Sequence, residues 1–401
     1  MALRSLLIHP LRSVLATLGV IIGVAAVVAA MAILEGMSAR VATGFSSMGS
    51  NRLYITPAIE RRSGRLVGNF DSLELEDAWA IDRECSAVRL AMPQISNGAL
   101  VKFMSRSTNA TILGATERYP LINNHQVADG EFLKASDVQG RTSVAVIGAK
   151  VKTELFGGRP ALGERIKIGG PLGTRTFTVI GIMEEKGNVA FTDVDQQVII
   201  PVTTAMDKLY GVKAVQAILA EAVSPADADI ELAKDQIKRL LRQRHKIRAG
   251  NQDDFQVQAQ KEFVEQFASF QRIVGVVLWS IAGISLVVGG IGIMNIMLVA
   301  VTERTREIGV RMAMGAQRMD VLRQFLVEAS IVSFLGGSLG VLLGWGLATT
   351  IERITRVMET ITTAGAVIMA LSMATMVGIV SGIYPAWKAS RLDPVEALRY
   401  E

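Results

Sequence analysis

The segment Thr302–Glu328 carries the residues whose types and spacing could do chemistry. Its sequence, TERTREIGVRMAMGAQRMDVLRQFLVE, mixes acidic and basic side chains between two long runs that contain no charge. Glu307 and Arg311 stand four residues apart, in the Glu-first order that stabilises a helix through an ion pair. Charges in this arrangement suit electrostatic docking of a partner in the cytoplasm, because they steer and orient a protein contact.

Six residues of this segment recur at spacings of four and three, which places them on one helix face. They are Ile308, Met312, Gly315, Met319, Leu322 and Leu326. Gly315 can divide the segment into two helices joined by a tight turn. Spacing alone leaves open a surface helix on the lipid headgroups, whose arginines only fix the topology. Glu328 pairs with a nearby arginine at the interface or, alternatively, relays protons.

The elements that position this segment are four stretches of sequence, called windows here, that contain no Asp, Glu, Lys or Arg. They are Ser13–Leu34, Ile273–Thr302, Ala329–Ile351 and Thr360–Trp387. Because a bilayer core of about 30 Å needs about 20 apolar residues in a helix, the sequence predicts a membrane α-helical protein with four transmembrane helices. The first window has an alternative interpretation as a cleaved signal peptide, but its apolar run exceeds the usual limit of about 15 residues.

Basic residues near the spans predict the topology. Arginines precede the first window, fill the loop between the second and third, and follow the fourth, so both termini and this loop are expected in the cytoplasm. The predicted order is a cytoplasmic amphipathic helix at 1–12, spans at 13–34, 273–302, 328–351 and 363–387, an extracytoplasmic domain at 35–272, a cytoplasmic loop at 303–327, a short external loop at 352–362 and a cytoplasmic tail at 388–401.

Short alternating runs broken by Gly, Pro and Asn predict a large mixed α+β domain between helices 1 and 2. The expected strands are 52–56, 99–103, 111–114, 143–147, 165–168, 176–182 and 197–201. The expected helices are 72–83, 149–156, 203–210 and 225–245, with a further helix at 251–271 that continues into the second span. The helices that continue the first and second spans should form stalks outside the membrane, because the second uncharged run exceeds the bilayer core.

Glycines in two spans are spaced for close helix packing. Gly19 and Gly23 in the first span, and Gly336, Gly340 and Gly344 in the third, form small-xxx-small patterns that let another helix approach. The alternative is that glycine is merely common in membrane helices.

The composition argues against several other functions. Residues 35–272 hold 30 Lys and Arg against 28 Asp and Glu, so the sequence predicts no nucleic-acid surface. The single cysteine, Cys85, cannot form an intrachain disulfide, and the three scattered histidines suggest no metal site. No H-E-x-x-H, G-x-S-x-G or G-x-x-x-x-G-K-[ST] motif occurs, so no catalytic residues and no bound cofactor are predicted.

Several segments resemble one family over nearly the whole chain and in the right order. TERTREIGVRMAMGA resembles the loop between the second and third spans of the MacB-type ABC-transporter permeases, which include lipoprotein-extracting and FtsX-like branches. SLLIHPLRSVLATLGVIIGVAAVV and SGIYPAWKASRLDPVEALRYE resemble the two ends of that family. SVAVIGAKVKTELFG, LGERIKIGG, FTVIGIMEEKG and QQVIIPVTTA resemble its periplasmic core.

The resemblance implies a homodimeric permease of the bacterial inner membrane, driven by ATPase subunits that bind ATP and Mg²⁺. The cytoplasmic loop would then be a coupling helix that docks on the ATPase. The residues that match this helix are Glu303, Arg304, Glu307, Ile308, Arg311 and Gly315. The family's outer domain has a porter-like subdomain, here about 50–115 and 215–260, interrupted by a second mixed subdomain, and it works by mechanotransmission.

The resemblance also implies the partners and the cargo. An adaptor protein and an outer-membrane channel complete such tripartite systems, which export drugs, peptides or lipoproteins. The alternative is an FtsX-like regulator that activates a cell-wall hydrolase, but its outer domain is typically much smaller. MacB itself carries an ATPase domain before the first span, whereas twelve residues stand there in this sequence. We therefore expect the ATPase on another polypeptide.

Overall fold

The structure, a computed structural model, describes residues 10–46, 51–62, 65–68, 71–189, 192–355 and 360–399. It divides into a helical unit, Met1–Ala39 with Ala268–Glu401, and a mixed α/β unit, Arg40–Phe267. The predicted amphipathic helix at residues 1–12 lies, except for its last three residues, outside the described part. The units correspond to the predicted spans and to the predicted domain between helices 1 and 2.

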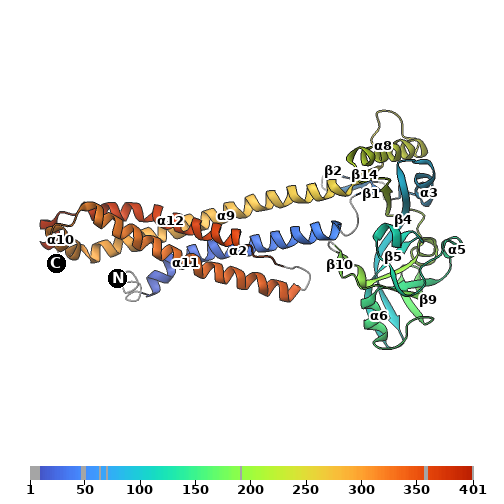
Figure 1. The fold of residues 1–401 in the computed structure, drawn as a ribbon, viewed down its shortest axis with the longest axis horizontal. Helices are drawn as coiled ribbons and strands as arrows, with labels where there is room; N and C mark the ends of the chain where they lie inside the picture. Colours follow the sequence, from blue (N-terminus) through green and yellow to red (C-terminus); the bar gives the residue numbers. More distant parts are fainter. Residues whose placement is uncertain are drawn as a thin grey trace. The chain divides into compact units, whose positions relative to one another are not determined.

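Four long helices make up most of the helical unit, which confirms the predicted fold class (Figure 1). They are α2 (Pro10–Ser46), α9 (Gln260–Glu303), α11 (Arg318–Thr355) and α12 (Ala364–Ser390). Each contains an apolar stretch long enough to cross a membrane. Two short helices, α10 (Thr305–Ala313) and α13 (Pro394–Arg399), complete the unit.

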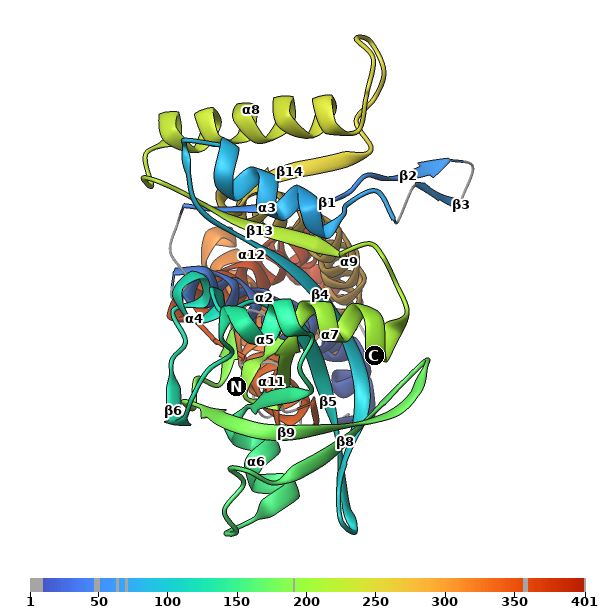
Figure 2. The ribbon, with the colours of Figure 1, turned by 90° about the vertical axis from the view of Figure 1, so that its right-hand side faces the viewer.

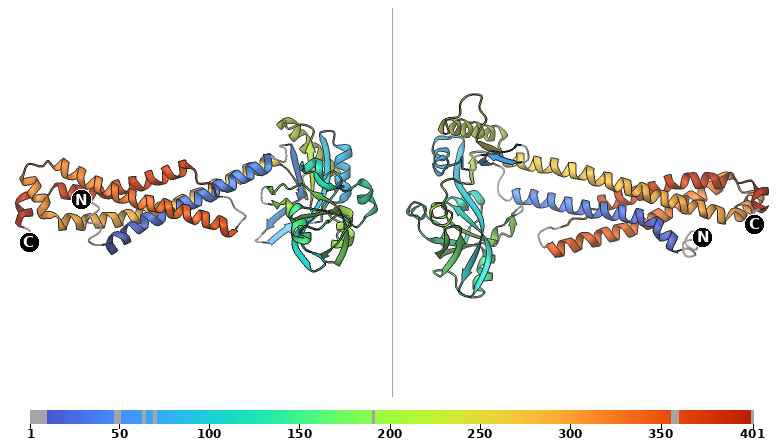
Figure 3. Two further views of the ribbon diagram at one scale, coloured as in Figure 1. Left: turned by 60° about the horizontal axis from the view of Figure 1, so that its bottom comes forward. Right: turned by 180° about the vertical axis from the view of Figure 1, so that it is seen from behind.

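The long helices pack around small and branched side chains. Val20, Val24 and Val28 of α2 are almost fully buried against residues of α9 and α11, and Ala374 of α12 is fully buried. Figure 3 shows these helices alongside one another in two further views. Large apolar side chains such as Ile284 remain exposed, as expected for a surface that faces lipid or another chain.

A sheet of ten strands organises the mixed unit, in the order β14-β1-β13-β4-β5-β12-β7-β9-β6, with β8 paired to β4 and β9. The strands are β1 (Arg52–Pro57), β4 (Val88–Phe103), β5 (Arg106–Ala115), β6 (Val127–Gly130), β7 (Val144–Ile147), β8 (Arg165–Gly170), β9 (Gly173–Met183), β12 (Gln197–Pro201), β13 (Ala217–Ala222) and β14 (Phe255–Ala259). Two hairpins are separate, β2 (Ile59–Arg62) with β3 (Arg65–Gly68) and β10 (Asn188–Val189) with β11 (Thr192–Asp193).

The helices of the mixed unit cover this sheet. They are α3 (Leu75–Glu84), α4 (Tyr119–Asn123), α5 (Ala135–Gly140), α6 (Ala149–Phe156), α7 (Val202–Thr204) and α8 (Asp227–Arg244), with the 3-10 helix η1 (Val194–Gln196) and the π-helix η2 (Ala205–Tyr210). Strand β4 runs from the lobe that carries α3 and α8 into the lobe that carries α6 (Figure 2). One long strand therefore joins two lobes, each with its own apolar core.

The lobe that carries α3 and α8 is called the first lobe below. Side chains of β1 alternate between two faces of this lobe, one apolar and one polar. Leu53 and Ile55 are fully buried in the same core as Ile81 of α3 and Ile237 of α8. The alternate residues of the strand, beginning with Arg52, point to the opposite face because the side-chain period of a strand is two. Cys85 also belongs to this core, where burial raises the pKa of its thiol to about 11. The thiol is therefore protonated and inert at neutral pH.

Most predicted strands and helices of the mixed unit occur, but one prediction is wrong. The expected helix at 251–271 is replaced at its start by strand β14, and α9 begins only at Gln260. Phe255 and Ala259 of β14 are buried while Gln256 is exposed, and the strand pairs with β1 in antiparallel register. Pairing with a distant strand thus overrides the local helical pattern. The strand predicted at 99–103 is the end of the much longer β4.

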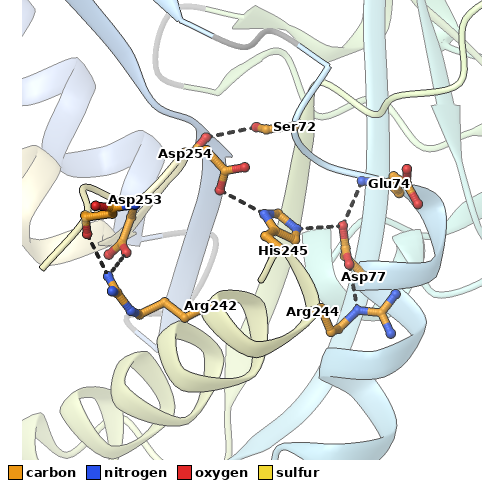
Figure 4. A network of polar contacts seen from close by, with 9 residues as sticks. Ser72, Glu74, Asp77, Arg242, Arg244, His245, Asp253 and Asp254 are labelled. Atoms are coloured by element: carbon orange, nitrogen blue, oxygen red, sulfur yellow. Dashed lines mark hydrogen bonds and ion pairs between the residues drawn. The ribbon is translucent and has the colours of Figure 1, made fainter. Parts of the chain in front are cut away.

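A half-buried histidine at the end of α8 connects this helix to α3 and to the residue before β14 (Figure 4). His245 places Nε2 3.2 Å from Oδ2 of Asp77 and Nδ1 2.8 Å from Oδ1 of Asp254. The Arg244 Nε donates to the other Asp77 oxygen at 2.7 Å. The hydrogen bond to Asp77 raises the pKa of His245 to about 9, with burial opposing it and Asp254 adding to it. The imidazolium form therefore holds the three elements together.

We expect this cluster to make the stability of the mixed unit fall as the pH rises from about 7 to about 9.5. The folded pKa of His245 lies above its ordinary value near 6.5, so its contribution is complete below about pH 6.5 and is lost through about pH 9. With allowance for solvent screening, the loss is about 1–2 kcal/mol. Urea unfolding followed by the fluorescence of Trp79, which packs on the first-lobe core, measures it.

The His245→Gln variant is the control for this pH dependence. It should be less stable than the wild type at pH 7, because Asp77 keeps only Arg244 as a cationic partner among the described residues. Its stability should change little between pH 7 and 9.5, since glutamine does not titrate. Parallel losses in the variant and the wild type would show that another group causes the pH dependence.

Candidate coupling interface

The charged segment folds as two helices with a break on either side of α10. Helix α9 ends at Glu303, Arg304 leaves the helical conformation, and α10 runs from Thr305 to Ala313. Gly315 follows with φ of +101°, a left-handed conformation that a residue with a Cβ rarely adopts, and α11 begins at Arg318. The tight turn predicted at Gly315 is therefore present.

One face of α10 is anchored in the helical unit. Ile308 is 2% exposed and belongs to the same core as Val321 and Phe325 of α11. Gly309 lies against α13, where a Cβ added to the glycine would stand 2.6 Å from the Cβ of Ala397. Only a residue without a side chain permits this approach. Met319, predicted on the same face, is 52% exposed instead.

The opposite face of α10 is exposed. Arg306 and Glu307 are exposed, and so are two apolar side chains, Val310 at 40% and Met314 at 78%. Exposed apolar residues among charges, on a short helix held rigidly from behind, form a surface suited to binding another protein.

A chain of polar contacts connects this exposed face to the interior. Arg311 pairs with Glu307 through Nη2 and donates from Nη1 to Oε1 of Gln324 at 2.8 Å. Gln324 in turn lies 3.5 Å from Glu328, and Glu328 accepts from Arg304 at 3.2 Å. Glu328 is thus paired with an arginine at the N-terminal end of the third predicted span. The contacts tie α10, the end of α9 and the start of α11 into one polar network.

The predicted coupling residues therefore fall into distinct positions. Glu307 and Arg311 lie together on α10, Ile308 anchors it, Gly315 makes the turn, and Arg304 binds Glu328. Glu303 is the last residue of α9, and its side chain is exposed. None of these groups is arranged as a nucleophile with a base, and within the described residues no cluster of three or more His, Cys, Asp or Glu could hold a metal.

Two contributors to the interface were not predicted from the sequence. Gln324 looks like an ordinary polar position of α11, and only the fold places it between Arg311 and Glu328. Helix α13 does carry a local signal, because Asp393 precedes Pro394 and its Oδ1 accepts from the backbone N–H of Val395 at 2.9 Å. An aspartate followed by proline is a typical helix start.

Four of the five predicted packing glycines lie where helices approach closely. A Cβ on Gly19 would stand 2.7 Å from the Cα of Gly289 in α9, and one on Gly23 would stand 3.3 Å from the Cβ of Ser285. A Cβ on Gly340 would meet the carbonyl oxygen of Ile21 in α2 at 2.8 Å.

The remaining two predicted glycines lie on the same helix, α11. A Cβ on Gly344 would meet the carbonyl oxygen of Ala25 in α2 at 2.7 Å. Gly336 is buried. Helix α2 is thus in backbone contact with both α9 and α11.

Comparison with known proteins gives the family. The MacB-like periplasmic core domain matches residues 13–240, and the FtsX-like permease C-terminal domain matches residues 279–394. The chain therefore belongs to the MacB-type family of ABC-transporter permeases, with a periplasmic core domain and transmembrane helices. The residues matched by the second domain include α10, α11 and α12, and so contain the candidate coupling helix just described but not Ala397 of α13.

Individual relatives agree with this assignment. The macrolide export ATP-binding/permease protein MacB of Bdellovibrio bacteriovorus is 39% identical over 401 residues, which is 99% of this chain and 61% of that protein. The pyoverdine export ATP-binding/permease protein PvdT of Pseudomonas syringae pv. tomato is 36% identical, over 100% of this chain and 59% of that protein. The chain thus spans about 60% of the length of the curated relatives it matches.

A solved structure, the periplasmic region of MacB from Actinobacillus actinomycetemcomitans, is 19% identical. The match between the two covers 56% of this chain and 95% of the solved chain, with a TM-score of 0.46.

Proposed function

We propose that this chain is the permease subunit of a MacB-type export system, which couples ATP hydrolysis by a partner ATPase to movement of the periplasmic domain. The observation that carries the proposal is α10, whose inner face is fixed to α11 and α13 while its outer face presents Arg306, Glu307 and Met314 to solvent. The family assignment supports it, because the relatives are named as ATP-binding and permease proteins.

Contacts inside the helical unit support the proposed topology. Gly309 of α10 contacts Ala397 of α13, so the loop after the second span and the segment after the fourth lie together. At the other ends of the spans, the Ile361 N–H donates to the Ala32 carbonyl and the Thr363 hydroxyl donates to Glu35. These contacts fit four spans that cross in alternate directions. We place α10, α13 and both termini in the cytoplasm, since the arginines gather there.

Movement at α10 has an unbroken structural path into the spans. Helix α10 is joined to α11 by the network of Arg311, Gln324 and Glu328, and α11 touches the backbone of α2 at Gly340. Helices α2 and α9 continue without interruption to Ser46 and Gln260. At about 1.5 Å per residue, the 44 residues of α9 extend about 66 Å, well beyond a bilayer core of about 30 Å.

The remaining partners and the cargo are part of the same proposal. Exposed apolar residues of α9, such as Ile273 and Ile284, offer a surface for a second copy of the chain within the membrane. An adaptor protein and an outer-membrane channel would complete the system. Relatives named for macrolide and pyoverdine export support export over regulation of a cell-wall hydrolase, and drugs, peptides and lipoproteins are the candidate cargo classes.

Purification of the chain from its own membranes in a mild detergent tests the proposal. We expect an ABC ATPase to purify with it, and we expect ATP hydrolysis by that ATPase to rise several-fold when the two are reconstituted together. The mechanism requires energy to be released outside these 401 residues. ATP hydrolysis by the 401-residue chain alone, or an ATPase rate that the permease leaves unchanged, would contradict it.

A further inference from the structure

Arg52, the first residue of β1, places a cation inside the periplasmic domain, and no described acidic residue forms an ion pair with it. Its side chain is 2% exposed, and its Nη1 donates to Oδ1 of Asn123 at 3.2 Å. Its Nη2 has no hydrogen-bond partner in the part of the chain that the structure describes, and no described carboxylate lies within 4 Å. Burial lowers the pKa of Arg52 below its ordinary value, although the guanidinium stays charged at neutral pH. A buried, unpaired charge costs free energy unless something compensates it.

The acid that faces Arg52 is already engaged elsewhere. Glu221 stands opposite Arg52 in the ladder of β1 and β13. Its carboxylate binds Arg89 and accepts from Asn51 at 3.2 Å. Tyr54 and Tyr119 also lie near the guanidinium. Burial raises the pKa of Tyr119 although the charge of Arg52 opposes this, so the Tyr119 hydroxyl is protonated. Protonated phenols offer hydrogen bonds but no negative charge.

A second cation reinforces the positive field. Lys186 donates from Nζ to the backbone carbonyls of Asn123 and Asn124, both at 2.8 Å, and no described carboxylate lies within 4 Å of it. Burial lowers the pKa of Lys186, and so does the positive charge of Arg52. The two cations therefore repel each other across Asn123, and an anion between or beside them would relieve both.

A cavity of about 450 Å³ opens beside Arg52. Its polar lining includes Tyr54, Tyr119 and Gln197, and none of the described lining residues is Asp or Glu. Its apolar lining includes Leu113 from β5 and Leu219 from β13. A cavity of this size can hold a small ligand, and its lining combines one fixed positive end with apolar walls.

We propose that this cavity binds an amphipathic oxyanion, whose phosphate or carboxylate group contacts Arg52 and whose apolar part lies against Leu113 and Leu219. Charge compensation selects an anion, since a neutral molecule would leave the unpaired guanidinium uncompensated. The site selects a compact oxyanion, because Arg52 offers one nitrogen without a described partner rather than a broad basic surface. The nearby Tyr119 hydroxyl donates to Oε1 of Gln197 at 3.4 Å. None of the described residues that line this cavity belongs to α10.

Calorimetric titration of the full chain in an uncharged maltoside detergent tests this site. The probes are hexyl phosphate, hexanoate, inorganic phosphate and hexanol. We expect the two amphipathic anions to bind, inorganic phosphate to bind more weakly, and hexanol to show no saturable binding. Arg52→Gln should weaken the binding of hexyl phosphate at least tenfold, since it removes the charge-assisted hydrogen bond. Lys102→Gln, which removes an exposed cation from β4, should leave binding unchanged.

The melting temperature of the ligand-free variant separates a binding role from a structural one. Arg52→Gln removes an unpaired buried charge, so the ligand-free protein should melt no lower than the wild type. If this variant does not fold, Lys186→Gln decides the question with an expected loss of several-fold in affinity.

Four results would overturn all or part of the proposal. Unchanged binding of hexyl phosphate by Arg52→Gln would exclude the site. If Arg52→Gln does not fold, unchanged binding by Lys186→Gln would exclude it. Destabilisation of ligand-free Arg52→Gln without loss of binding would assign Arg52 a structural role. Equal binding of hexanol would exclude recognition of charge. Equal binding of inorganic and hexyl phosphate would exclude the apolar part of the site and leave free phosphate as the ligand.

Discussion

Exchanging the charges of the α10 ion pair, in the double variant Glu307→Arg with Arg311→Glu, is expected to abolish stimulation of the partner ATPase while the permease stays folded. The exchange keeps an ion pair at four-residue spacing, and the side-chain amide of Gln324 can donate to the new carboxylate as it now accepts from Arg311. Loss of local stability should therefore stay below about 1 kcal/mol. The surface seen by the ATPase, however, is inverted, and like charges brought together at an interface cost several kcal/mol.

The measurement is the ATPase rate of the reconstituted complex, which should fall to near the rate of the ATPase alone. Arg353→Glu, a charge reversal on an exposed residue at the far end of α11, is the matched control and should keep full stimulation. Either single reversal should also uncouple, but it breaks the pair as well. If the double exchange restores the stimulation that the single reversals lose, the pair only holds α10 together and the docking surface lies elsewhere.

The spans could be predicted from the sequence because the bilayer excludes charge, so four uncharged windows suffice to find them. The first and last residues of these helices could not be predicted from the uncharged windows. Helix α9 begins at Gln260 and α11 at Arg318, both well before the uncharged windows, because a helix continues into water through charged residues. That α2 and α9 continue outside the membrane as stalks stays a prediction.

In the periplasmic domain, local alternation found strands such as β1 and β12 but not the partners that complete the sheet. Strand β13 carries a charged residue, Glu221, and its register is fixed by strands β1 and β4 far away in the sequence. The sequence of strand β14 predicts the start of a helix instead, because its place beside β1 depends on the same long-range pairing. Local periodicity carries no information on such partners.

The candidate sites divide in the same way. The candidate coupling residues stand out in the sequence because charge, spacing and family resemblance all point to one continuous segment, and their coupling role stays a prediction. The contact of Gly309 with Ala397 joins two segments that no local pattern connects. Arg52 looks like an ordinary polar position of an alternating strand, and only its burial and missing partner distinguish it. Features made by long-range packing thus require the structure.

Substituting alanine for Gly340 is expected to destabilise the helical unit and to weaken coupling. The added Cβ would stand 2.8 Å from the carbonyl oxygen of Ile21 and 2.8 Å from the Cβ of Val24. A backbone oxygen cannot rotate away as a side chain can, so α2 and α11 must separate along their contact. The expected cost is about 1–3 kcal/mol, as for overpacking of a core. Gly19→Ala should behave alike, because its Cβ would stand 2.7 Å from the Cα of Gly289.

The same helices supply the controls. A Cβ on Gly346 of α11 or on Gly283 of α9 meets no atom within 4 Å. Alanine there should be neutral or slightly stabilising, since glycine in a helix costs up to about 1 kcal/mol relative to alanine. Thermal unfolding in detergent, followed by fluorescence of Trp279 and Trp345, measures all four variants. ATPase stimulation by the Gly340→Ala and Gly346→Ala proteins then tests transmission. Equal melting temperatures would rule out close packing at Gly340, and full stimulation by a destabilised Gly340→Ala protein would show that motion does not pass from α11 to α2.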